Sequence, residues 1–139
     1  MKTRTVISSP HLVIMTEHHR RRLVLRLVGE LDVGNRDLLR NAISRALEDA
    51  PQMLVVDLSS LDFMDCSGLG VLVKVHEQLT ESQRQLVITG SQPIVRRLIR
   101  LTGLDTYLRL AEQHHPGTPD SPAVMASWRR RARACRARL

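Results

Sequence analysis

The chain has 139 residues, which is enough for one domain with a single core and too few for two domains of ordinary size. Its formal net charge is +7, but residues 113–139 carry six arginines against one acidic residue, and residues 1–112 are nearly neutral. The net charge therefore gives no reason to expect direct nucleic-acid binding by the folded part.

The two cysteines, Cys66 and Cys135, lie in segments of very different composition, which excludes a disulfide framework and a cysteine-based metal site. The N-terminal apolar run is too short and interrupted for a signal peptide, and no later run approaches the length of a membrane span. We therefore expect a protein of the reducing cytoplasm, with no membrane-spanning helix.

The predicted elements begin with two strands, at residues 11–16 and 23–28, joined by a polar hairpin turn. From residue 35 to 49, apolar side chains recur at steps of three and four, which predicts an amphipathic helix with Asn35 as its N-cap. Pro51 ends this helical pattern.

The second half of the chain alternates strands and helices. Its predicted strands are the runs MLVVDL, QLVITG and TYLRL, at residues 53–58, 85–90 and 106–110. One helix is predicted over residues 68–80, and another begins at Pro93 and ends with Gly103 as a left-handed C-cap.

This order predicts an α/β fold, a small mixed, mostly parallel sheet of four to five strands with helices packed on it. We expect the domain to span residues 1–112. Residues 113–139 are rich first in Pro, Gly and Ser and then in Arg, which is typical of a linker followed by a disordered basic tail.

The stretch LDFMDCSGLG, residues 61–70, joins a predicted strand to a predicted helix. Open α/β folds keep their sites at the carboxyl edge of the parallel strands, where the first amides of a helix also favour anions. Gly68 and Gly70 leave the first turn of the helix with little side-chain cover, so another protein could approach it closely.

These residues alone leave three interpretations open. An enzyme with Cys66 as nucleophile needs a base, yet His76 is ten residues away and Asp65 opposes thiolate formation. A purely structural interpretation makes Asp65 or Ser67 the helix cap and Cys66 a small apolar residue, but it does not explain Gly70. The third interpretation is a docking and modification site for a partner protein.

Three segments resemble, in the right order, the anti-sigma factor antagonists of the STAS family, over about residues 10–110. They are LVGELDVGNRDLL, LVVDLSSLDFMDCSGLGVLV and QLVITGSQPIVRRLIRLTGLDTYLRL. The resemblance implies a STAS-like fold and a bacterial partner-switching protein of transcription regulation and stress response. Such a protein binds a serine-kinase anti-sigma factor, which then releases its sigma factor; the resemblance implies no enzymatic activity and no cofactor.

The resemblance also places a phosphoacceptor serine directly after the aspartate of the motif, and this chain has Cys66 there. A phosphoserine adds nearly two negative charges to a docking surface, so its loss removes the usual off-switch. We therefore expect a protein held in its binding form. Phosphorylation at Ser67, or sensing through oxidation of Cys66, are the alternatives.

The partner-binding surface implied by the resemblance is formed by Glu30, Asp32, Asp65, Cys66, Ser67, Gly68, Leu69 and Gly70. Glu30 and Asp32 could equally form a polar turn. Asp57 could orient the motif loop or end a strand.

The remaining features leave some alternatives open. The pairs His18-His19 and His114-His115 have no third ligand at a suitable spacing, so we expect no metal site. The arginine-rich tail could touch nucleic acid or an anionic membrane surface, but a solvated end is the simpler interpretation. A STAS-like scaffold subunit of a lipid-transport or stressosome-type assembly remains the alternative function, and weak homodimer formation stays open.

Overall fold

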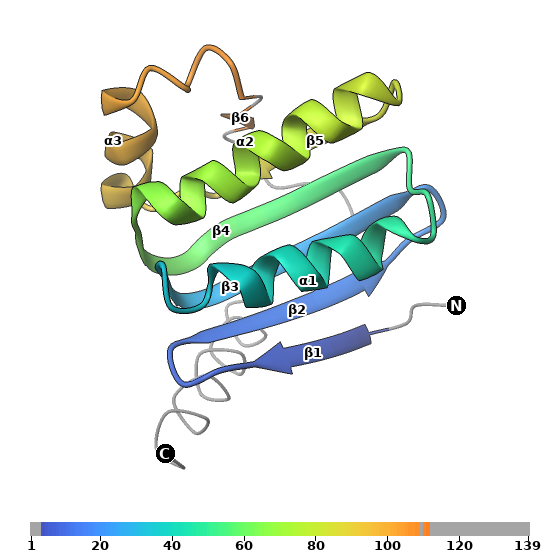
Figure 1. Cartoon of the computed structure of the whole chain (residues 1–139), viewed down its shortest axis with the longest axis horizontal. Helices are drawn as coiled ribbons and strands as arrows, with labels where there is room; N and C mark the ends of the chain where they lie inside the picture. The colour runs from blue at the N-terminus through green and yellow to red at the C-terminus, as the bar shows by residue number, and fades with distance from the viewer. Residues whose placement is uncertain (1–3, 109, 112–139) are drawn as a thin grey trace.

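The computed structural model describes residues 4–108, 110 and 111, and within them a six-stranded mixed sheet (Figure 1). Its strands are β1 (Arg4–Ser8), β2 (Leu12–His18), β3 (Arg22–Leu31), β4 (Met53–Met64), β5 (Gln85–Thr89) and β6 (Leu110–Ala111). They lie side by side in the order of the sequence. The pairings β1–β2 and β2–β3 are antiparallel, and the pairings from β3 to β6 are parallel.

In the described part of the chain, three helices accompany the sheet: α1 (Arg36–Leu47), α2 (Cys66–Glu81) and α3 (Pro93–Leu101). Helices α1 and α2 lie side by side over one face of the sheet (Figure 1). Each turns an apolar side toward the strands, with Leu39 and Ile43 from α1 and Leu72 and Leu79 from α2 almost fully buried. Burial of such aliphatic side chains supplies the main stabilising term of the fold.

A second set of buried side chains occupies alternate positions of the central strands and is therefore on the opposite face of the sheet. Its apolar members are Val13, Met15, Val24, Val28, Val55 and Val87, which lie outside the core cluster that the helices cover. This face also holds two ion pairs, Arg26 with Asp57 at 3.8 Å and Arg4 with Glu17 at 3.3 Å. Asp57 thus meets a cation across the strands; its carboxylate also accepts a hydrogen bond from the amide of Ser59.

The predicted fold class is confirmed, and so are the β2–β3 hairpin, the three helices and the strands β4 and β5. The sheet has one strand more than predicted, because the apolar pattern does not reveal β1. Its sequence, RTVIS, is an exposed edge with only two strongly apolar residues, so it lacks the signal of a buried strand. The last strand, predicted at residues 106–110, is shorter and later, at Leu110–Ala111.

Some element boundaries also differ from the predictions. Helix α1 ends at Leu47, before Pro51, because Ala50 takes a left-handed conformation with φ of 47°. Strand β4 continues to Met64, six residues beyond the predicted run. The domain boundary between residues 112 and 113, and the tail, lie outside the described residues, so that division stays a prediction.

Candidate functional site

The site begins where β3 and β4 end together. Two register shifts interrupt their pairing, yet the ladder continues until Leu31 lies opposite Met64. The amide of Asp65 then donates to the carbonyl of Leu31 at 3.1 Å. The loop after β3 and the start of α2 are therefore joined at the carboxyl edge of the parallel strands.

Asp65 is the N-cap of α2. Its Oδ1 accepts hydrogen bonds from the amides of Ser67 and Gly68, at 2.9 and 3.0 Å, and from the hydroxyl of Ser67 at 2.5 Å. Partial burial disfavours the charged carboxylate, but the hydrogen bonds from the Ser67 hydroxyl and from the amides of Gly68, Ser67 and Val33 outweigh it. They hold the pKa of Asp65 below its usual value, so the carboxylate is ionised at neutral pH.

The two candidate acceptor side chains differ in their surroundings. Cys66 is an exposed free thiol at the first residue of α2. The Ser67 hydroxyl is half-buried and donates to the Asp65 carboxylate. The structure therefore presents the thiol to solvent and ties the hydroxyl to the helix cap.

The two glycines of the motif play different parts. A Cβ on Gly68 would lie 2.7 Å from the side chain of Leu31 and 3.2 Å from that of Met64, so its missing side chain lets α2 approach the end of β3. A Cβ on Gly70 would meet nothing within 4 Å. The expectation of an uncovered first turn thus holds for Gly70 and is wrong for Gly68, which is buried by Leu31.

Leu69 is only 2% exposed and belongs to the core, so it holds α2 on the sheet and offers no contact area to a partner. The members of the predicted partner surface that face solvent at the start of α2 are Cys66 and Gly70, with Asp65 and Ser67 half-buried beside them.

The loop after β3 brings Glu30 and Asp32 to the same edge, both of them half-buried. Asn35 stands at the predicted N-cap position of α1, but its side chain makes no hydrogen bond to the helix. Its Oδ1 accepts from the amide of Asp32 at 2.9 Å, and its Nδ2 donates to the carbonyl of Glu30 at 2.8 Å. Asn35 thus fixes the shape of the loop, while Asp32 Oδ1 accepts from the amide of Gly34 at 2.9 Å.

Sequence reasoning missed two exposed apolar side chains at this edge. Val33 is 63% exposed, and its amide helps to stabilise the Asp65 carboxylate. Phe63, in β4 two residues before Asp65, is 42% exposed. The signal at Val33 is an apolar residue in an otherwise polar turn, and exposed apolar side chains such as Val33 and Phe63 can be covered by a partner.

A catalytic use of Cys66 gains no support from His76. The two residues are ten apart on one helix, which places them about 15 Å from each other along its axis. The ring of His76 instead packs edge-on against Tyr107, with ring centres 4.7 Å apart.

Within the described residues, the adjacent histidines His18 and His19 do not share an ion-pair partner. His18 lies 3.4 Å from Asp49 and His19 3.6 Å from Glu17, so the adjacent histidines face different acidic partners.

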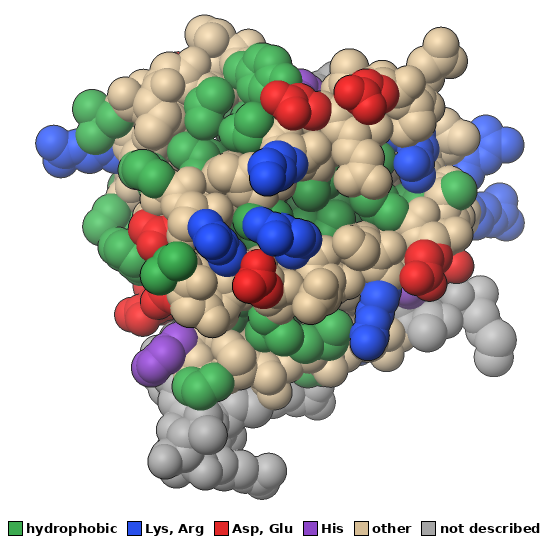
Figure 2. Space-filling model, in the orientation of Figure 1, with side chains coloured by type: hydrophobic (Ala, Val, Ile, Leu, Met, Phe, Trp, Pro, Cys, Tyr) green, Lys and Arg blue, Asp and Glu red, His purple; other side chains and the backbone are tan. Residues whose placement is uncertain are grey.

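Figure 2 shows side chains of both charges interspersed over the face that carries α1 and α2. In the described part of the chain, no helix is long and apolar enough to cross a membrane.

Comparison with known sequences gives a consistent result. A family model described as STAS domain matches residues 13–116. The anti-sigma F factor antagonist of Paenibacillus polymyxa is 35% identical over 95 residues, which are 68% of this chain and 81% of that protein. The anti-sigma-F factor antagonist RsfB of Mycobacterium tuberculosis is 33% identical over 110 residues, 78% of this chain and 89% of that protein.

Solved structures agree with these sequences. The crystal structure of an anti-sigma factor antagonist from Mycobacterium paratuberculosis has a TM-score of 0.69 and 30% identity, covering 86% of this chain and 96% of that one. SpoIIAA in its unphosphorylated form has a TM-score of 0.63 and 27% identity, and the match covers 72% of this chain and 89% of that one. The phosphorylated form of SpoIIAA from Bacillus has a TM-score of 0.58 and 26% identity, covering 72% and 92%. The fold, the motif at the carboxyl edge of the sheet and these matches together place the chain in the STAS-domain family of anti-sigma factor antagonists.

Proposed function

We propose that this protein binds a serine-kinase anti-sigma factor in the bacterial cytoplasm and thereby frees a sigma factor, without the usual phosphorylation off-switch. The docking surface consists of Glu30, Asp32, Asp65, Cys66, Ser67 and Gly70, with Val33 and Phe63 as its apolar part. Gly68 and Leu69 support this surface indirectly, because they are buried and hold α2 against the sheet. The protein acts through binding and carries out no reaction of its own.

The observation that carries this proposal is the exposed thiol of Cys66 at the first residue of α2. The relative SpoIIAA has an unphosphorylated and a phosphorylated form. A kinase that places an acceptor hydroxyl at this position in line with the γ-phosphate of ATP finds a thiol in its place. The partner surface therefore stays unphosphorylated.

Ser67 is a poor substitute for the missing hydroxyl. Its Oγ donates to the ionised carboxylate of Asp65. Phosphorylation would remove that donor and put about two negative charges beside the carboxylate, which like-charge repulsion opposes. It would also disturb the cap of α2, because Asp65 would lose a hydrogen bond.

The test is incubation with the cognate kinase and ATP, followed by intact-mass measurement. We expect the wild-type protein to stay unmodified and bound, and Cys66→Ser to gain one phosphate and to be released. Cys66→Ala serves as the matched control, since it changes the same position without adding a hydroxyl and should stay unmodified and bound.

Two results would contradict the proposal. A phosphate on the wild-type protein that disappears with Ser67→Ala would make Ser67 the switch and would end the proposal of a permanently binding form. A partner identified by mass spectrometry as a component of a transport or scaffold assembly would instead contradict the anti-sigma factor assignment.

A further inference from the structure

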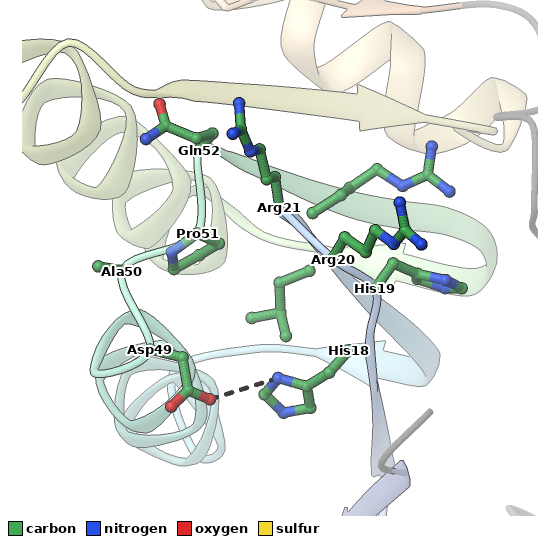
Figure 3. Close-up of a pocket in the computed structure, with 10 residues that line it drawn as sticks. His18, His19, Arg20, Arg21, Asp49, Ala50, Pro51 and Gln52 are labelled. Carbon is green, nitrogen blue, oxygen red and sulfur yellow. Dashed lines mark ion pairs between the residues drawn. The ribbon is translucent and has the colours of Figure 1, made fainter. Parts of the chain in front are cut away.

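A pocket of about 540 Å³ lies at the other end of the sheet from the motif. One wall is the β2–β3 hairpin, residues 18–23, and the other is the connection from α1 to β4, residues 49–52. Figure 3 shows Arg21 alongside Gln52 and His18 directed toward Asp49 across the pocket. The backbone joins the two walls, because the amides of Gln52 and Met53 both donate to the carbonyl of Arg21, at 2.8 and 3.2 Å.

The pocket is strongly basic. Three consecutive arginines, Arg20, Arg21 and Arg22, line it, and Arg20 and Arg21 are exposed. The acidic groups of the region already have basic side chains as partners: Asp49 lies 3.4 Å from His18, and Glu17 contacts both Arg4 and His19. Within residues 4–108, 110 and 111, Arg20 and Arg21 have no ion-pair partner. Their positive charge is therefore available to a ligand.

The size and the lining of the pocket indicate a class of ligand. Its volume falls in the range of about 300–1,000 Å³ usual for small-molecule sites. A guanidinium group matches the paired oxygens of a phosphate and can bind them in a bidentate manner. The Arg20 and Arg21 side chains point in different directions (Figure 3), so each would bind a separate phosphate group of one ligand. Leu23 and Pro51 are buried at the pocket and add an apolar surface.

We propose that this pocket binds a small molecule bearing linked phosphate groups, held by the guanidinium groups of Arg20 and Arg21. The ligand site lies at the amino ends of the parallel strands, whereas the docking surface lies at their carboxyl ends. It is therefore a second site, whose occupancy does not require the partner to leave.

Calorimetric titration of the full chain with inorganic pyrophosphate at constant ionic strength tests the proposal. We expect saturable binding with one site per chain. Replacing both side chains, Arg20→Gln with Arg21→Gln, should weaken it by about tenfold or more, since each lost contact is a charge-assisted hydrogen bond. Titration with ATP under the same conditions shows whether a nucleoside attached to the phosphates strengthens binding.

The matched control replaces two exposed arginines of α3, Arg97→Gln with Arg100→Gln, which removes the same charge elsewhere. Its pyrophosphate affinity should stay within about twofold of the wild type. Thermal unfolding of both double variants verifies that each is folded. Absence of saturable binding, or an equal loss in the control, would overturn the proposal, because binding would then follow net charge and not this pocket.

Discussion

At the scale of single residues, Gly68 allows α2 to pack closely against β3, whereas Gly70 leaves the start of α2 accessible to a partner. They lie two positions apart on the first turns of α2, yet a Cβ on Gly68 would press into Leu31 and one on Gly70 would point into open space. The motif therefore needs its two glycines for different physical reasons.

Alanine at the two positions should have opposite effects on stability. Gly68→Ala should lower the free energy of unfolding by about 1–3 kcal/mol, because the fully buried Leu31 side chain has no room to move. Gly70→Ala should raise it by about 0.5–1 kcal/mol through helix propensity. Urea unfolding of the two variants beside the wild type measures both effects. Equal changes of the same sign would contradict the close approach of α2 to β3.

The Asp65 carboxylate should make stability depend on pH. Partial burial acts to raise its folded pKa, but the hydrogen bonds from Ser67 and the nearby amides outweigh this and lower it. Its contribution is therefore complete above the ordinary value of 3.8 and is lost as the pH falls through the lowered folded pKa. Asparagine also caps helices, so Asp65→Asn removes the charge and keeps an acceptor.

We expect Asp65→Asn to be less stable than the wild type at pH 7, and the difference to shrink steadily below pH 3.8. Denaturant unfolding of both proteins from pH 7 to below pH 3.8 measures this difference in stability. Asp62→Asn is the control, because it makes the same substitution at an exposed residue away from the helix cap. A difference between Asp65→Asn and the wild type that stays constant with pH would show that the charge of Asp65 has no part in it.

At the scale of elements, the first turn of α2 is both a helix start and the centre of the proposed docking surface. A Cβ at position 70 would have no atom of the described residues within 4 Å. The same position can therefore report on partner binding with little effect on folding.

Gly70→Gln should weaken binding to the anti-sigma factor by about tenfold or more, because a long side chain would hold the partner away from Cys66. Thermal stability should stay equal or rise. Thr80→Gln, at the exposed far end of α2, is the matched control and should bind as the wild type does. If Gly70→Gln unfolds, or binds normally, the docking surface is misplaced.

The elements also show what the sequence could predict. The periodic apolar residues of α1 and the continuous run of β4 carry strong local signals, and these signals predict both elements. The edge strand β1 has no such signal, and the left-handed Ala50 that precedes Pro51 cannot be read from an alanine. The burial of Gly68 depends on Leu31, which is 37 positions away in the sequence, so only the folded chain reveals it. The pocket behind the β2–β3 hairpin likewise joins segments about 30 residues apart.

At the scale of the whole molecule, the buried members of the helix-covered core that belong to the described residues lie between Leu12 and Leu108. We therefore expect a chain that ends at Gln113 to keep a cooperative unfolding transition, as the proposed domain boundary requires. Circular dichroism during urea unfolding measures this. Loss of cooperativity would mean that the removed residues cover the second face of the sheet, where Val24 and Val55 are fully buried.

The sheet order, in which every strand neighbours the one before it in the sequence, has a consequence for synthesis on the ribosome. Each strand that emerges finds its pairing edge already formed, starting with the β1–β2–β3 antiparallel unit. No strand has to wait for a later one to be inserted beside it. The chain can therefore add its sheet one strand at a time, from the N-terminus onward, while translation continues.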